Sequence, residues 1–99
     1  IANNSSSKGG IYFPASCRKA TRFISICSAF GIPIIFLADS AGFMVGSAVE
    51  QAGIIKEAAL MMQTVANAKV AKLAAVVRRD YTAGVYAMSG GGMGDDGFI

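Results

Sequence analysis

The chain has 99 residues, enough for one small domain, and its apolar fraction of 54% stands against only 15% charged residues. A body of this size exposes much of its surface, so we expect some apolar faces to meet the rest of a longer chain or another subunit. The net charge of +3 suits an anionic ligand, while the lack of histidine removes Ser-His-Asp and Cys-His catalysis and histidine-ligated metal sites from this segment.

The ends of the sequence indicate a piece of a longer chain, and no targeting segment is visible. It begins with Ile1 instead of an initiator Met, and its first residues lack the charged region and apolar core of a signal peptide. The longest apolar run, residues 32–38, is far short of the roughly 18 residues of a membrane span.

The sequence offers no sign of a nucleic-acid site or of a cysteine-ligated metal site. It contains no basic run interleaved with aromatic residues, the pattern that would indicate nucleic-acid binding. Cys17 and Cys27 show no metal-type spacing, and we interpret them as reduced small hydrophobes.

The first third of the chain predicts a loop, a short strand and a helix. Residues 1–10 are polar and glycine-rich, and residues 11–13 follow as a possible strand. A helix starts near Pro14 and ends at Gly31, which is typical of a C′ residue. The i, i+3, i+4, i+7 spacing predicts one buried face. That face consists of Ala20, Phe23, Ile24 and Cys27.

The rest of the chain predicts an alternation of strands and helices. Residues 34–38 are a continuous apolar run, typical of a strand covered on both faces of a parallel sheet. A Ser-x-x-Glu capping box, Ser47 and Glu50, opens a helix that runs to about residue 68. Residues 70–77 are a second buried strand. A short helix over 83–89 and a turn over 94–97 follow.

This order predicts an α/β fold with parallel strands joined by crossover helices. The loops over residues 39–46 and 78–83 then both leave the carboxyl ends of parallel strands. They must emerge at the same edge of the sheet, where open α/β sheets bind ligands. The first loop contains two glycines, the second is followed directly by Gly84, and both lead into a predicted helix N-terminus.

The first loop carries the candidate binding residues Gly42, Phe43 and Gly46. The two glycines permit close approach of a ligand to the backbone, and the N–H groups at the following helix start favour an anion. A plain strand-to-helix loop explains the same residues. The loop matches neither a P-loop nor a dinucleotide fingerprint.

The second loop is the turn Tyr81-Thr82-Ala83-Gly84. Its N–H groups begin a helix, so they have no intrahelical partner and can point outward. Such donors stabilise negative charge that develops on a carbonyl oxygen. Close helix–strand packing would need the same small residues.

Charged residues flank this turn on both sides. Arg78 and Arg79 precede it and suit a phosphate or a carboxylate, but a solvated strand end is the alternative. Asp95 and Asp96 follow it and suggest either a divalent ion or a solvated turn.

At these two motifs the sequence resembles the carboxyltransferase (beta) subunit of biotin-dependent acyl-CoA carboxylases of the methylcrotonyl-, propionyl- and acetyl-CoA type. The similarity covers nearly the whole chain, and the order and spacing of its pieces make it specific. The matching pieces are residues 2–4, 20–24, 30–33, 42–46, Glu50 and 53–55, then Arg78-Arg79-x-Tyr81-x-Ala83-Gly84-x-Tyr86-x-Met88. The last piece is most similar to the methylcrotonyl-CoA branch.

The resemblance implies a crotonase-like (ClpP/crotonase) ββα superhelix, with residues 1–99 as a partial acyl-CoA carboxyltransferase C-terminal domain. In that family this half receives carboxybiotin and the other half holds the acyl-CoA, and carboxyl passes from biotin to the α-carbon of the thioester. The backbone N–H groups of Ala83 and Gly84 would be catalytic, holding the ureido oxygen of biotin. The cofactor-binding residues would be Gly42, Phe43, Gly46, Tyr81 and Thr82.

The resemblance also implies the cofactors and partners. Biotin would be carried on a partner protein or domain, the substrate would be a coenzyme A thioester, and no metal would bind in this segment. The partners would be a biotin carboxylase or biotin carrier subunit, the N-terminal half of the same subunit, and further copies of it. The location would be the cytoplasm, or the mitochondrial matrix in a eukaryote.

Three other functions stay open at this point. The first is the carboxyltransferase subunit of a biotin-dependent sodium-pumping acyl-CoA decarboxylase, and the second is a non-catalytic fragment that only assembles with partner chains. A nucleotide-binding module fits less well, since neither loop has the required spacing. In every case we expect the 99-residue chain alone to be inactive.

Overall fold

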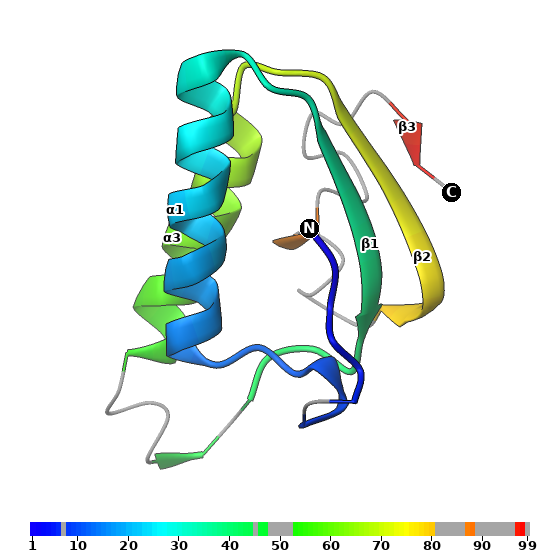
Figure 1. Ribbon diagram of the computed structural model, residues 1–99. Helices are drawn as coiled ribbons and strands as arrows, with labels where there is room; N and C mark the ends of the chain where they lie inside the picture. The colour runs from blue at the N-terminus through cyan, green and yellow to red at the C-terminus, as the bar shows by residue number, and fades with distance from the viewer. Residues whose placement is uncertain (7, 45, 48–52, 81–86, 89–96, 99) are drawn as a thin grey trace.

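The computed structural model describes residues 1–6, 8–44, 46–47, 53–80, 87–88 and 97–98. Two long helices lie side by side against one face of a parallel sheet (Figure 1). The elements, in chain order, are the 3-10 helix η1 (Lys8–Gly10), α1 (Pro14–Phe30), β1 (Ile34–Ser40), α3 (Ile54–Asn67), β2 (Lys72–Asp80) and β3 (Gly97–Phe98).

The sheet confirms the predicted pair of parallel strands joined by a helix. Its order is β1-β2-β3, and all the neighbours run parallel. β1 and β2 pair from Ile34 opposite Lys72 to Ala38 opposite Val76. On the free side of β1, the N-terminal segment adds one further parallel bridge, from Ala2 to Leu37.

Helix α1 begins and ends where the sequence predicts. Pro14 stands at its start, where a missing N–H costs no intrahelical bond. The Ser16 hydroxyl accepts a hydrogen bond from the Phe13 N–H at 2.8 Å and donates one to the Phe13 carbonyl at 2.9 Å. Gly31 ends the helix with φ 68°, a left-handed conformation that glycine adopts without a Cβ penalty. The prediction that Phe23 is buried is wrong, because the stripe through Cys17, Ile24 and Cys27 faces the core and leaves Phe23 at its margin.

Helix α3 starts later than predicted. Gly53 has φ 86°, which a right-handed helix cannot contain, so α3 begins only at Ile54 instead of running unbroken from Ser47. Ser47 is itself helical, while Glu50, the other half of the predicted capping box, lies outside the described residues. The predicted apolar stripe is confirmed. It consists of Ile54, Ala58, Met61 and Val65, all buried.

The prediction that β1 is covered on both faces is wrong for the described part of the chain. Ile34, Phe36 and Ala38 point to the helices and are buried, but Ile35 and Leu37 are 57% and 42% exposed. In β2, Leu73 and Val77 are exposed as well. Since Ile35 lies opposite Leu73 in the register, these side chains form one apolar surface on the side away from the helices. We call the four residues Ile35, Leu37, Leu73 and Val77 the outer apolar face.

Three shorter predictions have mixed outcomes. Tyr12 forms a single parallel bridge with Phe43 and not the predicted strand over 11–13. Gly97, predicted to end a turn, lies in β3 and pairs with Leu73. Of the predicted helix over 83–89, only residues 87–88 are described, and Ala87 is helical.

Neither long helix in the described ranges has the length and apolarity that crossing a bilayer requires.

Candidate functional site

The carboxyl ends of β1 and β2 meet at one edge of the sheet, as predicted, with Ser40 opposite Asp80. The first candidate loop leaves β1 at this edge. The second candidate loop leaves β2 there, but Tyr81, Thr82, Ala83 and Gly84 lie outside the described residues. Their role as an oxyanion site therefore stays a prediction, as does any role of Asp95 and Asp96, which also lie outside.

The first loop is anchored at Gly42. The Gly42 N–H donates to the buried hydroxyl of Ser40 at 3.0 Å, and the same hydroxyl donates to the Gly42 carbonyl at 3.3 Å. Gly42 has φ 115° and Gly46 has φ 135°, conformations that a side chain disfavours. The structure thus gives a local reason for both glycines.

The loop also packs against the segment that precedes α1. The Tyr12 N–H donates to the Gly42 carbonyl at 3.0 Å, and the Met44 N–H donates to the Tyr12 carbonyl at 2.9 Å. The rings of Tyr12 and Phe43 stack with centroids 4.7 Å apart. Gly42 and Phe43 therefore hold the loop in place, and direct contact of these residues or of Gly46 with a cofactor stays a prediction.

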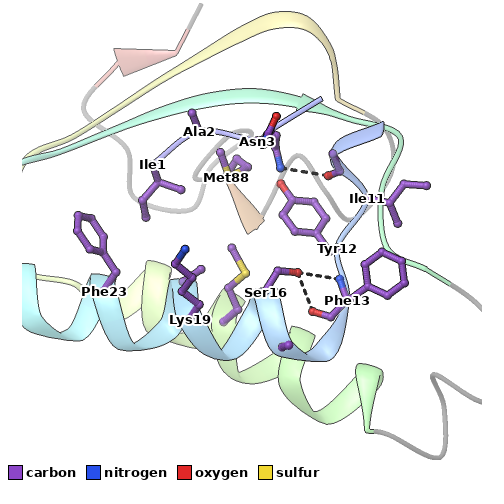
Figure 2. Close-up of a pocket in the computed structure, with 15 residues that line it drawn as sticks. Ile1, Ala2, Asn3, Ile11, Tyr12, Phe13, Ser16, Lys19, Phe23 and Met88 are labelled. Atoms are coloured by element: carbon purple, nitrogen blue, oxygen red, sulfur yellow. Dashed lines mark hydrogen bonds between the residues drawn. The ribbon is translucent and has the colours of Figure 1, made fainter. Parts of the chain in front are cut away.

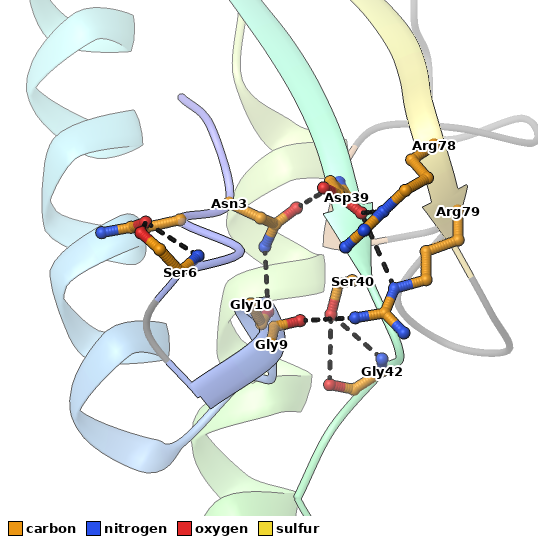
Figure 3. A network of polar contacts seen from close by, with 10 residues as sticks. Asn3, Ser6, Gly9, Gly10, Asp39, Ser40, Gly42, Arg78 and Arg79 are labelled. Carbon is orange, nitrogen blue, oxygen red and sulfur yellow. Dashed lines mark hydrogen bonds and ion pairs between the residues drawn. The ribbon is translucent and has the colours of Figure 1, made fainter.

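A charged network lies at the same edge (Figure 3). The Asp39 carboxylate pairs with Arg78 Nε at 3.1 Å and with Arg79 Nε at 3.7 Å. Arg79 also donates from its terminal nitrogen to the Gly9 carbonyl at 3.1 Å. The two arginines that the sequence offered as anion-binding residues thus share a carboxylate of the chain itself. The sequence prediction missed this pairing, although opposite charges at the ends of two neighbouring parallel strands could have indicated it.

Asn3 extends the network to the N-terminal segment. Its side-chain oxygen accepts the Asp39 N–H at 2.9 Å, and its side-chain nitrogen donates to the Gly10 carbonyl at 3.3 Å. A Cβ on Gly10 would collide with the Asp39 carbonyl oxygen. Sequence reasoning missed the roles of Asn3 and Gly10, since Asp39 lies 36 positions after Asn3 in the chain.

A pocket of about 640 Å³ opens between the N-terminal segment and the first half of α1 (Figure 2). Its described lining is mostly apolar and includes the basic side chain of Lys19. Met88, the last residue of the family-like piece that begins at Arg78, also lines it, so the chain beyond the second loop returns to this pocket. The sequence did not predict the pocket, which four separate segments build together.

Cys17 is not a nucleophile in this environment. Burial raises the pKa of its thiol to about 11, the Glu57 carboxylate adds to the rise, and Arg18 opposes it. Cys17 and Cys27 are both free and buried. Since the thiolate is the reactive form, Cys17 is inert at neutral pH, in line with its interpretation as a small hydrophobe.

The carboxyl transferase domain family matches residues 1–99, and the chain belongs to this family. It is 51% identical over 90 residues to the uncharacterized carboxylase YngE of Bacillus subtilis, covering 91% of this chain and 18% of that protein. It is 43% identical, again over 91% of its length, to 14% of the mitochondrial methylcrotonoyl-CoA carboxylase beta chain of Dictyostelium discoideum.

The solved structures agree with the sequence relatives. Transcarboxylase 12S superimposes with a TM-score of 0.95 at 33% identity, covering 98% of this chain and 19% of that one. The fold is therefore a partial crotonase-like α/β domain, as the sequence predicted. The chain spans less than a fifth of the length of each of these relatives.

Proposed function

We propose that this chain is the biotin-side part of a carboxyltransferase that moves a carboxyl group from carboxybiotin to the α-carbon of an acyl-CoA. In this proposal residues 1–99 are part of the C-terminal domain of a longer subunit in a biotin-dependent acyl-CoA carboxylase. The observation that carries it is the family match along the whole chain. The meeting of the β1 and β2 ends at one edge supports it, because that edge is where open α/β sheets bind ligands.

Carboxyl transfer from biotin requires hydrogen-bond donors beside the oxygen on which negative charge develops. Biotin, when bound, would supply the carboxyl group from its ureido nitrogen, the freed nitrogen would accept the α-proton that the carboxyl group replaces, and negative charge would develop on the ureido oxygen. In the proposal the N–H groups of Ala83 and Gly84 hold this oxygen, while Tyr81 and Thr82 flank it. Fixed donors of this kind act without having to reorient during the reaction.

The described residues are compatible with carboxybiotin at this edge of the sheet in two ways. Gly42 and Gly46 place no side chain at two positions of the neighbouring loop at the same edge, and the Tyr12–Phe43 stack fixes that loop. The net charge of the Asp39, Arg78 and Arg79 cluster is positive, which favours an approaching carboxylate. In the proposal Gly42, Phe43 and Gly46 form the part of the cofactor site that the first loop contributes.

The remaining parts of the activity come from outside this chain in the proposal. They are an N-terminal half that holds the acyl-CoA, a biotin carboxylase or biotin carrier subunit, and further copies of the subunit. The Dictyostelium relative is a mitochondrial beta chain, and transcarboxylase 12S forms a hexamer assembly. We accordingly propose a homo-oligomer of the cytoplasm, or of the mitochondrial matrix in a eukaryote.

A second candidate function runs the transfer in the other direction, from an acyl-CoA to biotin. The similarity to transcarboxylase 12S favours keeping it, since that structure has methylmalonyl-coenzyme A bound. The two candidates use the same site residues of this chain. They differ in the direction of transfer, which is measured by whether a labelled carboxyl group moves from biotin to the acyl-CoA or from the acyl-CoA to biotin.

The substitution Gly84→Pro in the full-length protein tests the proposed oxyanion site. Proline has no N–H, so we expect carboxyl transfer from a carboxylated biotin carrier to acyl-CoA to fall by about 100-fold or more. Gly84→Ala keeps the N–H and is the matched control, and it should lose much less. Transfer of a labelled carboxyl group measures both. Unimpaired transfer by Gly84→Pro would show that this N–H is not used.

A further inference from the structure

We propose that Asp39 is a positioning residue for the second loop, because it holds the irregular end of β2 from which the turn over residues 81–84 departs. The inference rests on the proposed function for its effect on carboxyl transfer. Its structural basis, however, lies entirely in the described residues. Asp39 would touch neither biotin nor acyl-CoA and would act only through Arg78 and Arg79.

The register of the sheet shows the irregularity. Ala38 lies opposite Val76, and the next pair is Ser40 opposite Asp80. Between these pairs β1 contains one residue, Asp39, whereas β2 contains the three residues 77–79. Such extra residues form a bulge, which bends a strand and redirects its side chains. The bulge ends one residue before the turn that carries the proposed oxyanion donors.

The bulge explains how two consecutive arginines reach one carboxylate. In a regular strand, neighbouring side chains point to opposite faces of the sheet. Here Arg78 Nε and Arg79 Nε lie 3.1 Å and 3.7 Å from the same oxygen, Oδ1 of Asp39 (Figure 3). The two ion pairs therefore form at the bulge, where the regular alternation of side chains is interrupted. Loss of the carboxylate leaves two like charges side by side at the bend.

Burial makes the Asp39 carboxylate the fixed centre of this cluster. Its side chain is 13% exposed, while the side chains of Arg79 and Arg78 are 31% and 60% exposed. Asp39 is also held through its backbone, since its N–H donates to Asn3 Oδ1 at 2.9 Å. Arg79 is held from the other side by the Gly9 carbonyl at 3.1 Å. The end of β2 is thus tied to β1 and to the N-terminal segment at once.

The first experiment substitutes Asp39→Asn in the full-length protein, which keeps the side-chain shape and removes the charge. We expect kcat of carboxyl transfer to fall between about 10-fold and 100-fold, the size of effect that a misplaced reacting group produces. The KM for acyl-CoA should change less than about twofold, because that substrate is held by the other half. Asp39→Glu, which restores a carboxylate, should recover part of kcat.

The matched control is Glu57→Gln. It removes an ion pair of similar length, Arg18 to Glu57 at 3.7 Å, that joins α1 to α3 away from this edge. We expect it to leave kcat unchanged. If Asp39→Asn does not fold, Arg78→Gln replaces it as the test, because that arginine is largely exposed, and it should lower kcat in the same direction by a smaller factor.

Hydrogen exchange separates this inference from the proposed function. In Asp39→Asn, backbone amides in the peptide covering 77–84 should exchange faster than in the wild type and in Glu57→Gln. If the wild type transfers no carboxyl group, the proposed function fails, but the exchange result still decides the positioning role. Unchanged exchange and unchanged kcat in Asp39→Asn would overturn the inference. The inference would also be overturned if Asp39→Asn lost kcat, acyl-CoA affinity and thermal midpoint to the same extent as Glu57→Gln, because the effect would then be general destabilisation.

Discussion

At the scale of single residues, Gly10 is a position where the structure leaves no room for a side chain. It has φ 73°, and a Cβ there would meet the carbonyl oxygen of Asp39. Its own carbonyl receives the Asn3 side chain, so the loop cannot move away without breaking that bond. Gly10 therefore allows the N-terminal segment to approach the end of β1.

The substitution Gly10→Ala should destabilise the protein more than Gly31→Ala does. Both lose about 1–2 kcal/mol to a left-handed backbone, since Gly31 has φ 68°. Only Gly10→Ala adds the collision, about 1–3 kcal/mol more, because an added side chain at Gly31 meets nothing within 4 Å. Denaturant unfolding of the two variants measures the difference. Equal losses would mean that the close approach at Gly10 has no energetic weight.

Residue-level prediction succeeded where the cause is local and failed where it is not. Gly31 was predicted correctly because a helix end and a following proline are signals within a few positions. Arg78 and Arg79 were recognised as charged residues beside the second loop, but their partner Asp39 lies about 40 positions earlier. A periodic pattern carries no information about such a pairing.

At the scale of elements, Lys72 joins the start of β2 to the end of α3. Lys72 is 3% exposed, and its Nζ donates to the Val65 carbonyl, in the last turn of α3, at 2.8 Å. A cation at a helix C-terminus complements the helix dipole, and here it adds a second hydrogen bond to a carbonyl that also accepts the Ala68 N–H at 3.4 Å. The sequence showed this lysine only as a charge near the start of an apolar strand.

The substitution Lys72→Met should lower the free energy of unfolding by about 1–2 kcal/mol, because the methionine fills similar space but cannot donate to Val65. Lys69→Met is the control, since that side chain is exposed and should change stability by less than about 0.5 kcal/mol. Chemical denaturation measures both. A Lys72→Met protein as stable as the control variant would contradict a stabilising role for this contact.

The order of the elements was largely predictable, and their boundaries were less so. The β1-α3-β2 unit follows from apolar runs and helical periodicity. The start of α3 was misplaced because Gly53 interrupts a pattern that otherwise continues on both sides. The pairing of Gly97 with Leu73 could not be predicted, since a two-residue strand has no periodicity to detect.

At the scale of the whole molecule, the outer apolar face is a surface that the described part of the chain leaves exposed. Its four large side chains lie on the side of the sheet away from α1 and α3. Contiguous apolar patches on proteins commonly mark surfaces that another part of a protein covers. The composition predicted such surfaces, and the relatives are more than five times as long as this chain. Which segment or subunit covers the face stays a prediction.

The most direct test of the central claim is transfer of a labelled carboxyl group. We predict that the full-length protein moves label from a carboxylated biotin carrier to the α-carbon of an acyl-CoA, and that residues 1–99 alone move none. The short chain lacks the half that holds the acyl-CoA in our proposal. A full-length protein that folds, binds the carrier and transfers no label in either direction would contradict the account, and so would transfer by the 99-residue chain alone.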